Sequence, residues 1–202
     1  MHPHALSARI VVVGGGVVVQ RCAQLMVWGC ALNMVDFLVT HEQMSDVSKA
    51  VEMFRGGCAC SQAILDVYGA PLGLPHEHAL RVSAGFAGGM RRGETCGAVT
   101  GAFMVLGLRH GSSDCGPDAG RAGVYERVVD FAKRFEQRNA SICCRELLGC
   151  DISTPEGMKQ AQERDLFKTT CVQMVRDAAE ILEEMEAESQ PSAAGGADKP
   201  LA

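Results

Sequence analysis

The fold is decided by a glycine-rich turn that runs directly into an apolar helix, Gly93-Glu94-Thr95-Cys96-Gly97-Ala98-Val99-Thr100-Gly101. Cys96 stands where the turn becomes the helix, so its thiol meets unpaired N–H groups and the positive end of the helix dipole. Both favour the thiolate, which is the form that binds metals and exchanges electrons. The chain carries 10 cysteines in 202 residues. The central question is therefore whether several of them meet in space.

Composition and spacing around this stretch favour packed helices over a sheet. Gly97 and Gly101, beside Ala98 and Ala102, place small residues at a four-residue spacing that permits close helix contact. Aromatic residues, which strands prefer, make up only 5% of the chain. We predict an all-α fold, a compact bundle of about five to seven short helices with a glycine-rich loop before the central helix.

Apolar periodicity and end signals place the helices along the chain. The pattern predicts helices over residues 47–54, 59–68, 76–84, 97–109, 118–137, 143–148 and 165–188. Ser45 is expected to cap the first helix, and Pro75 to open the third. Gly85–Gly93 is predicted to be a loop with positive φ at several positions, and Gly149–Gly157 a further loop.

Residues 1–43 read differently from the rest of the chain. Gly14-Gly15-Gly16 lies between two short apolar runs, but Val19 stands where a dinucleotide-binding fingerprint needs its third glycine. A clear signal-peptide cleavage site is missing, and Gln20 and Arg21 interrupt any membrane span. Met44 resembles a natural start, so residues 1–43 are predicted to be an N-terminal extension. Whether this extension belongs to the native protein stays open.

The remainder divides into one domain and a tail. Residues 44–188 are predicted to form a helical, cysteine-rich domain, and this length is enough to build a core without disulfide staples. Residues 189–202, rich in Ser, Ala, Gly and Pro, are predicted to be a disordered tail.

Four cysteines are each predicted to point inward from a different helix. Cys60 and Cys171 lie on apolar faces, Cys96 begins the central helix, and Cys144 sits in the first turn of a short helix. No C-x-x-C pair is present, so neither a zinc knuckle nor a thioredoxin motif can be identified. We expect Cys60, Cys96, Cys144 and Cys171 to converge near the Gly85–Gly93 loop.

Five segments in this order resemble the redox-active protein family with the C_GCAxxG_C_C signature. They are Gly57-Cys58-Ala59-Cys60-Ser61-Gln62-Ala63-Ile64-Leu65, then Gly85-Phe86-Ala87-Gly88-Gly89-Met90, then Thr95-Cys96-Gly97-Ala98-Val99-Thr100-Gly101, then Cys144-Arg145-Glu146-Leu147-Leu148-Gly149, and Cys171. The resemblance runs from about Val47 to Met185. It implies redox activity for the domain of residues 44–188.

The resemblance places the four signature cysteines on Cys60, Cys96, Cys144 and Cys171. This sequence has Cys-Gly-Ala at Cys96 where the family label has Gly-Cys-Ala. Three further cysteines lie close to the signature positions and are alternates for the same site: Cys58, Cys143 and Cys150.

The resemblance implies a cofactor, because the related domain of split-Soret cytochromes is thought to hold an iron–sulfur cluster on such cysteines. Four thiolates are the ligand set of such a cluster or of a zinc site. We therefore predict an iron–sulfur cluster or another metal, with zinc or no cofactor as the alternatives, serving electron transfer or redox sensing. Arg91, Arg92 and Arg145 could offset the negative charge of four thiolates, or simply be solvated.

Two other functions stay open. Without a metal, the chain could be a thiol–disulfide oxidoreductase that uses Cys96 as the attacking thiolate, with Cys143-Cys144 exchanging with Cys60 or Cys96. It could also be a non-catalytic helical binding module whose cysteines are core residues. The sequence does not decide whether the protein is an enzyme.

Charge and thiol content limit the partners. The net charge is −5 and no basic stripe appears, so no nucleic acid is expected as a partner. No clear membrane span is present, and free thiols persist in a reducing compartment, so we predict a cytoplasmic protein. The redox partner is unknown, and a homo-oligomer stays open.

Overall fold

The structure, a computed structural model, describes residues 9–13, 16–20, 44–116 and 120–189. Contacts divide the chain into two units, residues 1–42 and 43–202. In the first unit, β1 (Arg9–Val13) pairs antiparallel with β2 (Gly16–Gln20). The predictions of an N-terminal extension and of a disordered tail concern mostly residues that lie outside the described ranges.

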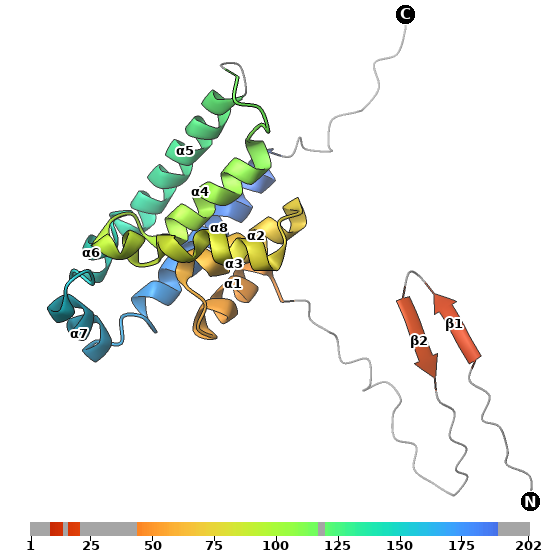
Figure 1. The fold of residues 1–202 in the computed structure, drawn as a ribbon, viewed down its shortest axis with the longest axis horizontal. Coiled ribbons are helices and arrows are strands. Elements are labelled where there is room, and N and C mark those ends of the chain that lie inside the picture. The colour runs from red at the N-terminus through yellow and green to blue at the C-terminus, as the bar shows by residue number, and fades with distance from the viewer. Residues whose placement is uncertain (1–8, 14–15, 21–43, 117–119, 190–202) are drawn as a thin grey trace, which may run out of the picture. The chain divides into compact units, whose positions relative to one another are not determined.

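The second unit is a helical bundle in the part that the structure describes (Figure 1). Its eight α-helices are α1 (Asp46–Arg55), α2 (Cys60–Gly69), α3 (His76–Ser83), α4 (Gly97–His110), α5 (Arg121–Asn139), α6 (Cys144–Leu148), α7 (Pro155–Glu163) and α8 (Thr170–Ser189). The all-α prediction is confirmed. Three shorter turns accompany them: η1 (Ala70–Leu72), η2 (Ala84–Phe86) and η3 (Gly89–Gly93).

Helix α7 was not predicted, because residues 149–157 read as a loop. The Thr154 hydroxyl accepts a hydrogen bond from the Gly157 N–H, and Pro155 occupies the first helical position. Helix α8 begins at Thr170, later than the predicted residue 165. Asp165 has φ 51°, and a left-handed residue cannot continue an α-helix.

The central contact of the bundle is between α2 and α4, and two glycines of α4 allow it. A Cβ on Gly101 would lie 2.9 Å from the Ser61 carbonyl oxygen and 3.1 Å from the Ile64 Cβ. A Cβ on Gly97 would overlap the Cys60 sulfur. The small-residue spacing of α4 therefore sets how closely the two helices approach.

Two apolar clusters fill the bundle. Residues of α1, α2, α4, α5 and α8 contribute to the main cluster. Phe131 is fully buried in it. The centre of its ring lies 5.9 Å from that of Phe103, with the ring planes at 80°, and 6.2 Å from that of Phe135. A smaller cluster gathers around α6 and α7 at one end of the bundle, and includes Leu148 and Ile152 (Figure 1). The smaller cluster contains Cys144, and the main cluster contains Cys96.

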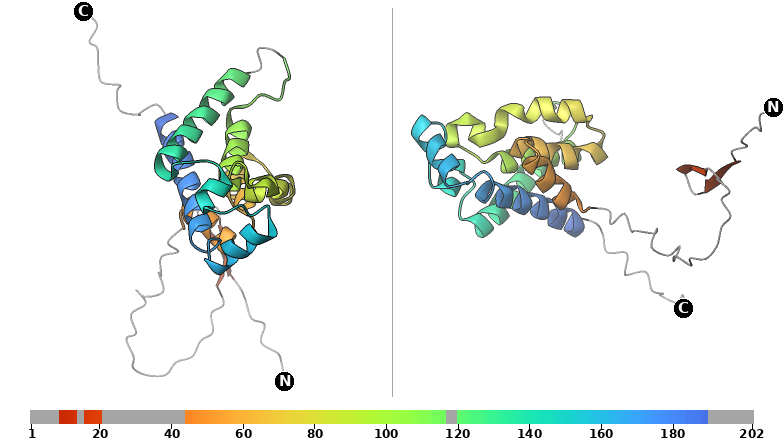
Figure 2. Two further views of the ribbon diagram at one scale, coloured as in Figure 1. Left: turned by 90° about the vertical axis from the view of Figure 1, so that its left-hand side faces the viewer. Right: turned by 90° about the horizontal axis from the view of Figure 1, so that it is seen from below.

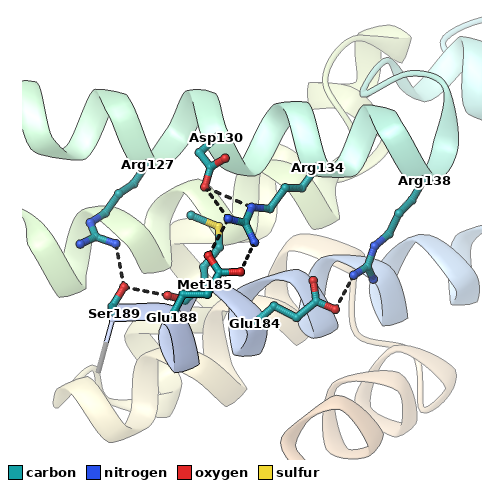
Figure 3. Close-up of polar contacts among 8 residues, drawn as sticks. All are labelled: Arg127, Asp130, Arg134, Arg138, Glu184, Met185, Glu188 and Ser189. Atoms are coloured by element: carbon teal, nitrogen blue, oxygen red, sulfur yellow. Dashed lines mark hydrogen bonds and ion pairs between the residues drawn. The ribbon is translucent and has the colours of Figure 1, made fainter. Parts of the chain in front are cut away.

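Helix α8 packs against α1, α4 and α5 (Figure 2). Ion pairs connect the exposed face of α8 to α5 (Figure 3). The Arg134 guanidinium donates to both carboxylate oxygens of Glu188, at 2.8 and 2.7 Å, and Arg138 bridges Glu180 and Glu184. The acidic run near the C-terminal end of α8 thus serves partly as the counter-charge of α5.

Among the helices that the structure describes, none combines the length and the apolar character required to traverse a bilayer.

Candidate functional site

The four signature cysteines line a single cavity of about 150 Å³. Cys60 and Cys96 reach it from the main cluster, whereas Cys144 and Cys171 belong to the smaller one. The other lining residues are mostly apolar: Phe54, Ala59, Ala87, Gly88, Arg91, Ile152, Phe167 and Met174. The structure thus brings together cysteines that are far apart in the sequence, at the boundary between two parts of the core.

Each signature cysteine stands at the beginning of a helix. Cys60 is the first residue of α2, and Cys96 is the residue immediately before α4. Cys144 is the first residue of α6, and Cys171 is the second residue of α8. Helix starts present unpaired N–H groups and the positive end of the dipole, so this arrangement favours negative charge on the sulfurs.

Two backbone hydrogen bonds hold the segment of Cys96 beside that of Cys144. The Cys96 N–H donates to the Ile142 carbonyl at 2.8 Å, and the Cys144 N–H donates to the Glu94 carbonyl at 2.7 Å. These bonds form an isolated antiparallel bridge between Thr95 and Cys143. The bridge fixes the start of α4 relative to the start of α6.

Side-chain hydrogen bonds fix the start of α2, which carries Cys60. The Ala59 N–H donates to the Gln62 side chain at 2.9 Å, and the Gln62 amide donates to the Leu80 carbonyl at 2.9 Å. The buried Ser61 hydroxyl donates to the Ser83 carbonyl at 2.8 Å. The sulfur of Cys60 is therefore held on a rigid helix end rather than on a loop.

One turn of left-handed backbone borders the cavity. Gly88, Gly89, Met90 and Arg91 have φ of 62°, 59°, 54° and 59°. A Cβ on Gly89 would overlap the backbone of Glu94, so this position requires glycine. The prediction of several positive φ values in the loop is correct, but the structure extends them to two residues that are not glycine. The turn places Gly88 in the lining of the cavity beside Cys60, and its backbone contributes to the lowered pKa of Cys60.

Cys60 is the sulfur that ionises first in the metal-free protein. The Cys96 thiol donates a hydrogen bond to the Cys60 thiolate, and this lowers the pKa of Cys60 to about 7 despite its burial. Donors from the Gly88 and Ser61 backbone act in the same direction. The same hydrogen bond, together with burial, raises the pKa of Cys96 well above its usual value.

The remaining two sulfurs stay protonated near neutral pH. Burial first, and then the negative charge of Cys60, raise the pKa of Cys144 to about 12. The same two causes raise the pKa of Cys171 to about 12. At Cys96 the hydrogen bond with Cys60, then burial, then the charge of Cys60 act against the effect of the helix start. The role of Cys96 as attacking thiolate stays a prediction.

Zinc ions and iron–sulfur clusters both take cysteine thiolates as ligands. Within the described residues, no group of three or more His, Cys, Asp or Glu side chains is close enough to hold a single metal ion. A tetrahedral zinc site needs four sulfurs within about 2.3 Å of one point. The four thiols are instead spread around a cavity, with N–H donors and helix starts facing it.

The three alternate cysteines do not line the cavity. The Cys143 thiol donates to the Gly93 carbonyl at 3.2 Å, and Cys58 is half-buried one residue before Ala59. Cys150 is buried in the smaller cluster, close enough to Cys144 and Cys171 for its charge to affect their pKa values. All eight cysteines in the described ranges are free thiols.

Sequence reasoning missed the apolar wall of the cavity. Ile152 and Phe167 flank α7, the helix that was not predicted, so neither was assigned to the site. The Thr154-Pro155 pair was the available signal for α7. Met174, one turn along α8 from Cys171, could have been placed on the same side from its spacing.

Comparison with known proteins identifies the family. The family model described as "Putative redox-active protein (C_GCAxxG_C_C)" matches residues 58–185, which is more than half of the chain. No curated protein and no solved structure matches the chain. The chain belongs to the C_GCAxxG_C_C redox-active protein family.

Proposed function

We propose that this member of the C_GCAxxG_C_C family binds an iron–sulfur cluster through Cys60, Cys96, Cys144 and Cys171, and uses it for electron transfer or redox sensing. The observation that carries the proposal is that all four signature sulfurs line one cavity. Four thiolates are the usual ligand set of a cubane or a two-iron cluster. Such a cluster, when bound, would supply a one-electron couple.

The surroundings of the cavity support an anionic cofactor. Four helices begin at it, and the Gly88 backbone contributes to the lowered pKa of Cys60. Backbone donors to ligand sulfurs stabilise negative charge and tune the reduction potential. The lining residues Ile152, Phe167 and Met174 keep water away from part of the site. These groups belong to the chain and act whatever cluster type is bound.

Cofactor binding would be coupled to proton release. In the metal-free protein Cys60 is the most acidic of the four thiols, whereas the pKa values of Cys96, Cys144 and Cys171 are raised. Metal ligation requires thiolates, so three thiols must lose their protons as iron binds. Assembly should therefore be favoured by rising pH.

The proposal is tested by anaerobic reconstitution with ferrous iron and sulfide. We expect a visible chromophore, with iron and acid-labile sulfide bound to the wild-type chain. Cys144→Ala and Cys171→Ala should each lose most of the bound iron, whereas Cys58→Ala and Cys115→Ala should keep it. A wild-type chain that folds but takes up no iron or sulfide would refute the proposal.

The second candidate is a dithiol–disulfide couple between Cys60 and Cys96, and the direct interaction of these two thiols favours it. The Cys60 thiolate would attack a small-molecule disulfide, so that a mixed disulfide forms and one small thiolate leaves. Cys96 would then lose its proton, attack the Cys60 sulfur and release the second small thiol. Two electrons pass to the small disulfide; the Cys96 proton ends on one released thiol, and the other leaves as a thiolate.

The couple is tested on metal-free protein exposed to an excess of an oxidised small disulfide. Peptide mapping should find a Cys60–Cys96 disulfide in the wild type and a trapped mixed disulfide on Cys60 in Cys96→Ala. Oxidation that joins only Cys58, Cys115 or Cys143 would refute this candidate.

A further inference from the structure

The lining of the four-cysteine cavity contains a single charged side chain besides the thiols, that of Arg91. Arg91 is exposed, so it stands at the rim where the cavity meets solvent. No ion pair engages it within the residues that the structure describes. Its positive charge is therefore available to an anion in the cavity.

The backbone is bent in an unusual way to bring this side chain to the cavity. Arg91 has φ 59° and follows three residues that are also left-handed. A left-handed conformation is unfavourable for a residue other than glycine. The turn folds the arginine back over Gly88: a Cβ built on Gly88 would lie 3.7 Å from the Arg91 Cδ and 3.9 Å from its Nη1. Gly88 lines the cavity together with Cys60.

The two other arginines near the loop do not share this position. Arg145 is paired with Glu94, and it also donates to the Gly93 carbonyl at 3.2 Å. Arg92 is exposed and does not line the cavity. Of the three arginines that the sequence singles out, only Arg91 lines the cavity.

We propose that Arg91 is the anion-binding residue of this cavity: it offsets the negative charge of the signature thiolates and, in the metal-free protein, draws small carboxylate-bearing molecules toward the Cys60 sulfur. The inference rests on the proposed function only in taking the four-cysteine cavity as the functional site. It does not depend on which cofactor is bound.

The test compares two alkylating reagents of similar size, anionic iodoacetate and neutral iodoacetamide, on the metal-free full-length chain. In both reactions the Cys60 thiolate displaces iodide from a methylene carbon, so one S–C bond forms as one C–I bond breaks. Mass spectrometry of the Cys60 peptide gives the rate with each reagent. The iodoacetate-to-iodoacetamide rate ratio reports the charge near the sulfur, and any common effect on thiol reactivity cancels.

We expect Arg91→Gln to lower this ratio at Cys60 by roughly threefold or more, which is the size of the loss of one nearby charge in a solvated setting. Arg91→Lys should keep most of the ratio. Met90→Gly is the matched control, because it changes the same left-handed turn without changing charge. The exposed Cys115 provides an internal control whose ratio should not respond.

An unchanged ratio at Cys60 in a folded Arg91→Gln protein would overturn the inference, as would an equal drop in Met90→Gly. Circular dichroism verifies that each variant is folded. The outcome is separate from that of the cluster proposal. A chain that binds iron and sulfide but shows no Arg91-dependent ratio refutes only the inference. A chain that binds neither but shows the ratio change refutes only the cluster.

Discussion

At the scale of single residues, the site depends on an asymmetry between two neighbouring thiols. Cys60 gains a hydrogen bond from Cys96 and has a lowered pKa, whereas Cys96 is the donor and has a raised pKa. In both functions proposed above, Cys60 would be the first of the four thiols to react, because its pKa is the lowered one.

The asymmetry predicts a pH dependence for the alkylation of Cys60 in the metal-free protein. Below its folded pKa the thiol is protonated and slow, and above it the thiolate reacts, so the rate should rise with a midpoint near pH 7. Cys96→Ala removes the first cause of the low pKa, and the midpoint should move up toward the ordinary value of about 8.5. Arg91, Cys144 and Cys171, which line the same cavity, are unchanged in the comparison.

This midpoint is measured from the rate at which iodoacetamide alkylates Cys60 between pH 5 and 10. Mass spectrometry of the Cys60 peptide gives the rate. A midpoint that is the same in wild type and Cys96→Ala would contradict the assigned hydrogen bond.

At the scale of elements, the approach of α2 to α4 positions the sulfurs. Gly97 has no room for a Cβ because the Cys60 sulfur and the Ala87 backbone occupy that space. Gly107, nearly three turns further along α4, has nothing within 4 Å of a Cβ built at its position. The site therefore requires glycine at position 97 of α4 but not at position 107.

This difference predicts opposite effects for the same substitution. Gly97→Ala should destabilise the fold by about 1–3 kcal/mol through overpacking, and it should lower the iron bound after reconstitution. Gly107→Ala should stabilise the fold by up to about 1 kcal/mol, because alanine is the better helix former. Urea denaturation and iron content measure both. Equal behaviour of the two variants would show that α2 and α4 do not meet as described.

Most helix positions, but not all, could be predicted from the sequence. Helix periodicity and capping signals located α1 to α6 to within a few residues, and they put the signature cysteines at or near helix ends. They missed α7, whose N-cap at Thr154 lies in a stretch that also contains loop-forming residues. They also could not predict the positive φ at Met90 and Arg91, because only glycine signals that conformation in a sequence.

At the scale of the whole molecule, the cavity lies where two apolar clusters meet. The convergence of the cysteines depends on contacts between distant segments, such as the Thr95–Cys143 bridge. No local pattern encodes such a contact. The sequence could therefore nominate the four cysteines, but their meeting in one place is a property of the folded chain.

Substitutions in the main cluster away from the cavity should change the free energy of unfolding but not iron uptake. Phe131 is fully buried against Phe103 and Phe135 and does not line the cavity. Phe131→Ala should cost about 3–5 kcal/mol in the free energy of unfolding, and Phe131→Leu clearly less. Under conditions where both remain folded, iron uptake should match the wild type. Loss of iron uptake in a folded Phe131→Leu protein would contradict this separation of core and site.

The most direct test of the central claim is X-ray absorption at the iron edge of the protein purified without oxygen. We expect iron in a shell made only of sulfur, with iron–iron scattering. Both features should be lost in a variant in which Cys60, Cys96, Cys144 and Cys171 are all replaced by alanine. Iron bound through oxygen or nitrogen, or the same spectrum in that variant, would contradict it.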